Sequence, residues 1–254
     1  MTLGSYDYLQ ALFLLTARHS AALWLLPAFG LRSLPAPARL ALALMVTAAI
    51  LPPGSRVGAF PGAEPGFLLA LAGEVGLGLL IGFVVTLVFG AIRGGGALTD
   101  MQLGMNSASL FDPSVQAGQT PIETLSNLLA TLLFFVTNSH HQFLLGLKEL
   151  AASLPAGQLP AGIPTGAVVL PLVGAMLEAA LRLALPMLAI TLLVDLGLAL
   201  ASRMVPQLQP FYLSPPIKTV VGLGVMVLSM PLWGVAVTAM FEAMPSQFLR
   251  LAAP

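Results

Sequence analysis

The apolar positions of the chain gather into six long runs, separated by segments rich in glycine, proline and polar residues. The runs cover residues 9–29, 38–51, 66–92, 121–147, 167–201 and 217–240. Such runs predict helices that lie in a membrane. Their lengths do not predict six simple crossings, because a straight crossing takes about 20 residues. Residues 38–51 are too few to cross alone, whereas residues 167–201 would extend about 52 Å as a helix, against a hydrocarbon core of about 30 Å.

Proline and glycine predict how the runs connect and pack. A proline-rich turn over residues 32–39 separates the first two runs, which we expect to pair as a helical hairpin. Small residues four apart let helix backbones approach closely, as we expect at Gly78 and Gly82. The three glycines at positions 94–96 predict a flexible hinge. The fold class predicted is an all-α membrane protein, with a single domain over residues 1–254.

Residues 100–121 interrupt the apolar pattern with a polar island that reads DMQLGMNSASLFDPSVQAGQTP. Each unpaired amide or backbone group in hydrocarbon costs several kcal/mol, so lipid cannot surround this segment. We expect it to lie at a water interface, or inside the protein facing a pore or a partner. An aspartate before a proline, as in Asp112-Pro113, commonly begins a turn. Alternatively, this turn presents Phe111 with Met101 and Met105 as a soft, adaptable obstruction.

Three ionisable residues lie within the fifth run, where lipid would disfavour them. Glu178 and Arg182 are four apart, in the favourable order for an ion pair within one helix. On a straight helix Asp195 would lie about 140° around from Arg182 and could not join that pair without a kink. Pro186 could supply the kink, and a partner chain is the other option. We favour a structural ion pair over a functional carboxylate here.

Composition excludes several classes of function. Only 8% of the residues are charged, whereas soluble domains carry about 25%, so this is a membrane-class protein. The zero net charge argues against nucleic acid as a partner, and the absence of cysteine excludes thiol chemistry. Three histidines without clustered carboxylates predict no metal site. Phosphate-binding glycine loops, zinc-protease motifs and serine-nucleophile motifs are absent from the sequence, so we expect neither a cofactor nor catalysis.

Five stretches together resemble the FliR family of flagellar biosynthetic proteins, to which the T-subunits of virulence type III secretion are closely related. The resemblance covers essentially the whole chain and keeps the order of the motifs. It departs at Ser139, where the family more often has glycine. The stretches are QLGMNSASLFDP over residues 102–113, Asn138-Ser139-His140-His141, Glu178 with Arg182, Pro186 and Asp195, Arg203-Met204-Val205-Pro206-Gln207, and Pro215-Pro216-Ile217-Lys218.

The resemblance implies a non-enzymatic subunit of a flagellar export gate in the bacterial inner membrane, at the flagellar basal body. Members of the family form overlong, kinked helical hairpins that pack into a multi-subunit helical assembly with FliP-type and FliQ-type subunits and other export-apparatus membrane proteins. Unfolded flagellar proteins pass through its centre. In the family, the loop corresponding to residues 102–113 contributes a plug across the closed channel. The plug residues implied here are Gln102, Gly104, Met105, Asn106, Phe111, Asp112 and Pro113.

The remaining motif residues receive supporting roles. We expect Glu178 and Arg182 to hold helices or neighbouring subunits in register, with Asp195 as a further polar group of the same run. We expect Pro186 and Pro206 to set kinks. Arg203 and Gln207 belong to the loop that follows the fifth run.

Three alternatives stay open at this stage. The chain could be a T-subunit of a virulence system, although the Phe111-Asp112-Pro113 turn and the Pro206-Gln207 pair favour the flagellar one. It could be a small-molecule transporter with a helix broken around the polar island. An intramembrane hydrolase would instead lose its activity, with assembly intact, when one carboxylate is changed.

Overall fold

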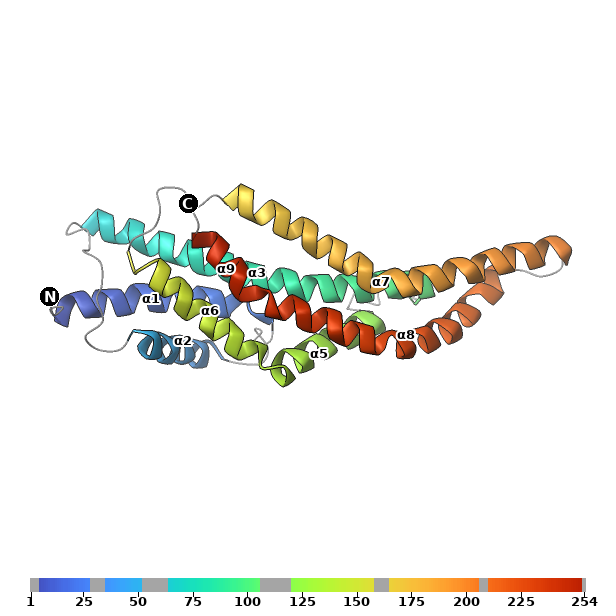
Figure 1. The fold of residues 1–254 in the computed structure, drawn as a ribbon, viewed down its shortest axis with the longest axis horizontal. Helices are drawn as coiled ribbons and strands as arrows, with labels where there is room; N and C mark the ends of the chain where they lie inside the picture. The colour runs from blue at the N-terminus through green and yellow to red at the C-terminus, as the bar shows by residue number, and fades with distance from the viewer. Residues whose placement is uncertain are drawn as a thin grey trace. The chain divides into compact units, whose positions relative to one another are not determined.

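A computed structural model describes residues 5–27, 35–51, 64–105, 120–157, 165–205 and 210–252. Every regular element within these ranges is a helix, which confirms the all-α prediction (Figure 1). The helices are α1 (Ser5–Leu25), α2 (Ala36–Ile50), α3 (Glu64–Leu103), α5 (Pro121–Val136), α6 (Ser139–Ser153), α7 (Thr165–Met204), α8 (Pro210–Glu242) and α9 (Met244–Ala252).

Three helical stretches of the described chain are long and apolar enough to cross a membrane: Gly66–Leu103, Val169–Met204 and Tyr212–Leu249. A fourth is possible if α5 and α6 act as one broken span, since they meet at a bend of 68°. Helices α3 and α7 have 40 residues each, about 60 Å, or roughly twice the hydrocarbon core. The expectation of overlong helices in place of six tidy crossings is therefore confirmed.

The apolar run over residues 121–147 is divided by this bend. Asn138 has a φ of 56°, in the left-handed region that asparagine tolerates better than most residues, and it precedes the first residue of α6. Its carbonyl accepts the N–H of His141 at 2.9 Å, so the new helix begins at once. One apolar run therefore forms two helices here.

The described residues divide into two compact units, the first within Met1–Val88, Phe134–Val173 and Met240–Pro254. In this unit α1 and α2 lie side by side (Figure 1). The Tyr8 hydroxyl near the start of α1 donates to the carbonyl of Leu51 just after α2 at 3.3 Å, so the two helices run antiparallel. The predicted hairpin is confirmed. Phe143 of α6 and Phe248 of α9 pack edge to face, with ring centroids 5.8 Å apart.

The close approach expected at Gly78 and Gly82 is also found in the first unit. A Cβ added to Gly78 would collide with the backbone oxygen of Arg18, and one added to Gly82 would lie 2.7 Å from the backbone oxygen of Ala22. Helices α1 and α3 therefore touch backbone to backbone along this line, which requires glycine.

The second unit comprises Phe89–Leu133 and Gly174–Ala239. It contains the glycine triplet at positions 94–96, which lies within the uninterrupted helix α3. A Cβ on Gly95 would lie 3.0 Å from Leu183 Cβ of α7, and one on Gly96 would collide with the Ser126 side chain of α5. The predicted hinge is wrong, because these glycines serve close helix packing.

Candidate gating site

Helix α3 ends inside the polar island, just before Gly104. Gly104 has a φ of 74°, which favours glycine. Its N–H donates to the carbonyl of Met101 at 3.3 Å, and the N–H of Met105 donates to the carbonyl of Asp100 at 3.1 Å. This pair of bonds is the Schellman motif, which satisfies the last carbonyls of a helix. The first residues of the island, including Gln102, are therefore helical, and the loop begins later than predicted.

The side chain of Asp100 caps the helix on the other side of the island. Its Oδ2 accepts the backbone N–H of Glu123 at 2.8 Å and the hydroxyl of Thr120, and its Oδ1 accepts the N–H of Ile122 at 3.2 Å. A carboxylate at this place satisfies the free N–H groups of α5 and suits the positive end of its dipole. Pro121 fits the first turn of α5 because it has no backbone N–H that would need an acceptor there.

The two ends of residues 106–119 therefore meet at one fixed point. Asp100 is fully buried there. The guanidinium of Arg93 donates to Glu123 at 2.9 Å and adds a second link between α3 and α5. Met105 at the end of α3 and Thr120 before α5 thus both bond to Asp100. We define the clasp as Asp100 with Thr120, Ile122 and Glu123.

An apolar cluster lies next to the clasp and shares Ile122 with it. Its buried members are Leu103 of α3, Ile122 of α5, Met187 of α7 and Met226 of α8. Met105 packs against this cluster, whereas Met101 is exposed. Methionines adapt to the shape of their neighbours, so this contact can tolerate rearrangement.

Several predicted site residues lie outside the described residues. They are Asn106, Phe111, Asp112, Pro113, Pro206 and Gln207.

The structure places the predicted ionisable residues of α7. Arg182 and Glu178 form an ion pair of 2.5 Å, with exposed fractions of 73% and 60%. Asp195 is not part of that pair: its carboxylate binds Lys218 of α8 at 2.8 Å. Arg203, predicted in the loop after the fifth run, lies instead in the last turn of α7, where it is exposed. Helix α7 changes direction along its length (Figure 1). The kink at Pro186, which lies within α7, stays a prediction.

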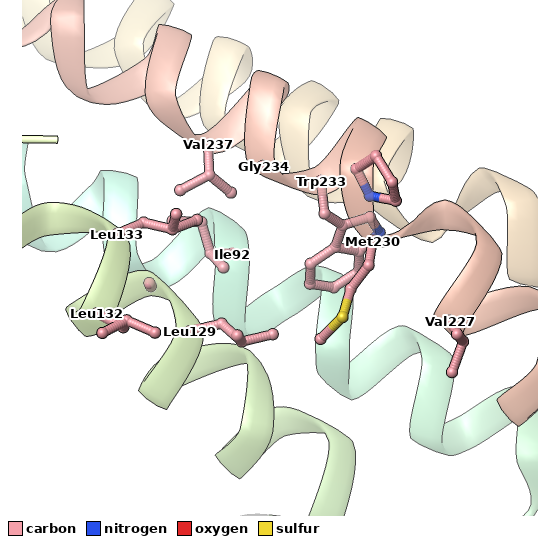
Figure 2. Close-up of a pocket in the computed structure, with 11 residues that line it drawn as sticks. Ile92, Leu129, Leu132, Leu133, Val227, Met230, Trp233, Gly234 and Val237 are labelled. Carbon is pink, nitrogen blue, oxygen red and sulfur yellow. The ribbon is translucent and has the colours of Figure 1, made fainter. Parts of the chain in front are cut away.

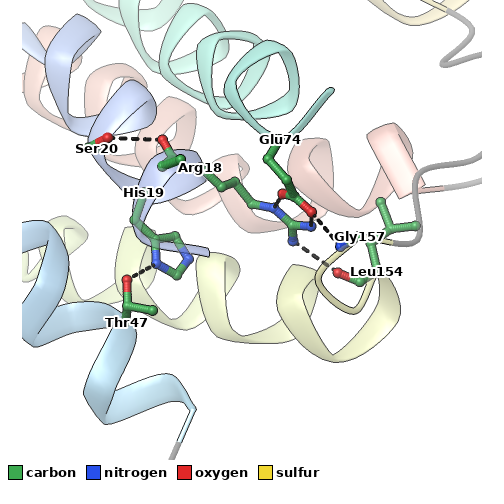
Figure 3. Close-up of polar contacts among 8 residues, drawn as sticks. Arg18, His19, Ser20, Thr47, Glu74, Leu154 and Gly157 are labelled. Atoms are coloured by element: carbon green, nitrogen blue, oxygen red, sulfur yellow. Dashed lines mark hydrogen bonds and ion pairs between the residues drawn. The ribbon is translucent and has the colours of Figure 1, made fainter. Parts of the chain in front are cut away.

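Sequence reasoning missed a buried ion pair between α1 and α3 (Figure 3). Arg18 is 1% exposed and Glu74 is fully buried, and two hydrogen bonds of 2.5 and 3.0 Å join them. The same guanidinium donates to the carbonyl of Leu154 at 3.0 Å, and the N–H of Gly157 donates to Glu74 at 2.9 Å. The pair thereby fixes the turn after α6 to both helices. The available signal was that each charge stands alone in an apolar run.

His19 forms a second polar contact beside this pair, toward α2. Its Nδ1 lies 2.8 Å from the hydroxyl of Thr47, and that hydroxyl already donates to the carbonyl of Ala43 at 2.7 Å. Because a hydroxyl has one proton, His19 must donate through Nδ1. The contact links the two helices of the hairpin.

An apolar pocket of about 390 Å³ opens in the second unit between α3, α5 and α8 (Figure 2). Trp233 forms part of its wall and donates its indole N–H to the carbonyl of Leu183 at 3.1 Å. Every lining residue is apolar or glycine, so the pocket suits an apolar side chain or a lipid chain better than a polar solute. The lining residues are Ile92, Leu129, Ala130, Leu132, Leu133, Val227, Met230, Pro231, Trp233, Gly234 and Val237.

Among the described residues, no group of three or more histidines and carboxylates is placed to hold a metal ion.

Comparisons with known proteins agree on one kind of relative. A protein-family model described as "Bacterial export proteins, family 1" matches residues 9–244. The flagellar biosynthetic protein FliR of Escherichia coli (strain K12) is 32% identical over 210 residues, which are 81% of this chain and 78% of that protein. FliR of Caulobacter vibrioides is 28% identical over 219 residues, 85% and 87% of the two chains. Yop proteins translocation protein T of Yersinia pestis is 31% identical over 156 residues, 61% and 60%.

Proposed function

The chain belongs to the bacterial export proteins of family 1, and from this premise we propose that it is a subunit of the flagellar type III export apparatus and gates its channel. The observation that carries the gating role is the clasp. Asp100 bonds to residues on both sides of segment 106–119, at the end of α3, a helix that is long and apolar enough to span a membrane. We propose that the segment between these two attachment points blocks the passage in the closed state and moves aside when the channel opens.

The plug in this proposal begins where α3 ends. Gln102 lies in the last turn of α3, Gly104 turns the chain, and Met105 packs against the apolar cluster. Beyond them, Asn106, Phe111, Asp112 and Pro113 form the part that crosses the closed channel. Such a protein acts by position and displacement, and we propose that it is not an enzyme.

Exposed apolar surface supports assembly with other subunits. On α7 and α8 many large apolar side chains are exposed, among them Leu177, Leu192, Leu228 and Val235. Lipid could cover such a surface, but the exposed Glu178–Arg182 pair on α7 favours protein or headgroup contact. We propose that FliP-type and FliQ-type subunits and other export-apparatus membrane proteins cover it, in the bacterial inner membrane at the flagellar basal body. Unfolded flagellar proteins would be the cargo.

Two observations bear on the alternatives. Flagellar proteins from Escherichia coli and Caulobacter align with 81% and 85% of this chain and the Yersinia translocation protein with 61%, and of the two systems we propose the flagellar one. The pocket of the second unit is apolar, so it offers a small polar solute no partner and supports the transporter alternative poorly.

Deletion of residues 106–113 tests the plug. The variant complex is purified, reconstituted in vesicles and compared with wild type by ion conductance, and subunit content is measured on the same sample. We expect an assembled complex that leaks small ions. A deletion of equal length at residues 54–61, in the glycine- and proline-rich segment before α3, is the control. Unchanged conductance in an assembled 106–113 deletion would contradict the plug.

A further inference from the structure

Arg39, in the first turn of α2, is a buried cation without an acceptor in the described part of the chain. It is 6% exposed, and its Nε and Nη1 atoms are buried with no hydrogen-bond partner there. The ion pairs of the described residues use other cations: Arg18, Arg93, Arg182 and Lys218. A buried charge with unpaired donors is strongly unfavourable, so this position favours a bound acceptor, and an anion above all.

Trp24 of α1 fixes the orientation of that guanidinium. The Cζ atom of Arg39 lies 4.2 Å from the centroid of the Trp24 ring, a cation–π contact. The contact places the Trp24 ring against the guanidinium and leaves the Nε and Nη1 donors without a partner among the described residues. Two nitrogens of one guanidinium edge, such as Nη1 with Nη2, can donate two parallel bonds to a phosphate or a carboxylate.

The N-terminus of α2 strengthens the attraction for an anion. The helix follows Pro35, has no side-chain cap bond, and has no acidic residue in its first turn. The positive end of the helix dipole therefore acts in the same direction as the Arg39 charge. The first turn concentrates positive potential and supplies no anion of its own.

The neighbouring surface indicates the source of the anion. Leu40, Leu44 and Met45 of α2 and Trp24 of α1 are all exposed, in a chain with helices that can span a membrane. At about 22 Å, α2 is shorter than the hydrocarbon core. An arginine and a tryptophan at one end of a short apolar surface suit the headgroup level of a bilayer, where tryptophan is enriched. The anion found at that level is the lipid phosphate.

We propose that Arg39 and Trp24 form a binding site for the phosphate of an anionic phospholipid. The guanidinium binds two phosphate oxygens, the N-terminus of α2 faces the same charge, and the acyl chains lie along the exposed side chains of Leu40, Leu44 and Met45. The site holds the hairpin of α1 and α2 at a defined depth in the membrane.

The test uses the full-length chain with its co-purified subunits, in detergent. It is titrated separately with dioleoylphosphatidylglycerol, with dioleoylglycerol, which lacks phosphate, and with inorganic phosphate. Native mass spectrometry measures retained ligand, and a thermal scan measures the melting temperature. The variants are Arg39→Gln and Arg39→Lys. Lys148→Gln, which removes an exposed cation of α6, is the matched control.

We expect wild type and Lys148→Gln to retain phosphatidylglycerol, and Arg39→Gln to bind it about tenfold more weakly or worse. Arg39→Lys should fall between them, because lysine is a point charge and cannot donate the paired bonds. Phosphatidylglycerol should raise the melting temperature of wild type but not of Arg39→Gln. The melting temperature of Arg39→Gln without lipid separates a folding defect from a binding defect. It should not be lower than that of wild type, since the substitution removes an unpaired buried charge.

Three results would overturn the proposal. Equal retention of dioleoylglycerol and phosphatidylglycerol would show that phosphate is not recognised. Binding of inorganic phosphate as tight as that of the lipid would show a site for free phosphate. Loss of a co-purified subunit from Arg39→Gln, with lipid binding unchanged, would show that a partner's carboxylate, and not a lipid phosphate, binds the Arg39 guanidinium.

Discussion

The carboxylate of Asp100 in α3 accepts the backbone N–H of Glu123 in α5 at 2.8 Å, across the polar segment that separates the two helices in the sequence. A helix usually receives its cap from the residue just before it. Here the cap comes from the preceding helix, so the start of α5 cannot shift without disturbing the end of α3. Opening of the proposed gate must therefore move the segment itself, or break this clasp.

Asp100→Asn should destabilise the protein while leaving the fold intact. The amide keeps one acceptor but loses the charge that favours the helix N-terminus, so we expect a loss of about 1 kcal/mol in the free energy of unfolding. Asp100→Ala should cost more, because the buried N–H groups of α5 then have no acceptor. Denaturant titration in mixed micelles measures both. Glu149→Gln, at an exposed position of α6, is the control, and equal behaviour of Asp100→Asn and this control would contradict the clasp.

Gly104→Ala should strain the end of α3. Its φ of 74° is costly for a residue with a Cβ, by roughly 1–2 kcal/mol. Gly104→Asn should cost less, since asparagine tolerates this conformation. Gly90→Ala is the matched control in the same helix, because a Cβ there meets nothing within 4 Å. Denaturant titration that shows equal stability for Gly104→Ala and Gly90→Ala would argue against the glycine turn.

The apolar runs predicted the helices, the hairpin and the excess length of α7, because all three depend on local composition. They placed the end of the third run at residue 92, whereas α3 continues to Leu103. The extension depends on partners far away in sequence. Arg93 pairs with Glu123, and Asp100 is buried against α5, so these polar residues can remain in a helix. A single run of sequence carries no information about such partners.

The same limit explains the missed ion pair. Arg18 and Glu74 are 56 residues apart, and each stands in an apolar run. Composition shows that each needs a partner, but not which one. By contrast, Glu178 and Arg182 are four apart on one helix, so their contact could be predicted directly.

Breaking the Arg18–Glu74 pair from one side should be severe. Arg18→Met leaves a buried carboxylate and Glu74→Gln leaves a buried guanidinium, and each should lower the free energy of unfolding by about 3–5 kcal/mol. The double variant Arg18→Met/Glu74→Leu should be less destabilised than the sum of its single changes, because no uncompensated charge remains. A double-mutant cycle by denaturant titration measures the coupling. Simple additivity would contradict a direct interaction.

The exposed pair on α7 should matter for assembly more than for folding. Within one chain, Arg182→Leu should change the free energy of unfolding by less than about 1 kcal/mol, because the pair is exposed. We expect the same change to reduce recovery of co-purified subunits, and Arg182→Lys to reduce it less. Subunit ratios after affinity purification provide the measurement. If both variants assemble like wild type, the pair does not hold subunits in register.

Gly78 and Gly96 should respond differently to a compensating change. A Cβ on Gly78 collides with the backbone oxygen of Arg18, which no side-chain change can remove, so Gly78→Ala should force α1 and α3 apart at about 1–3 kcal/mol. The collision of Gly96→Ala is instead with the side chain of Ser126.

Gly96→Ala/Ser126→Gly should therefore recover part of the stability lost in Gly96→Ala, whereas Gly78→Ala/Ala21→Gly should recover little. Gly76→Ala is the control in the same helix, because a Cβ at Gly76 has nothing within 4 Å. Thermal unfolding of the purified variants distinguishes these cases. Recovery by Ala21→Gly would mean that α1 approaches α3 through side chains and not through its backbone.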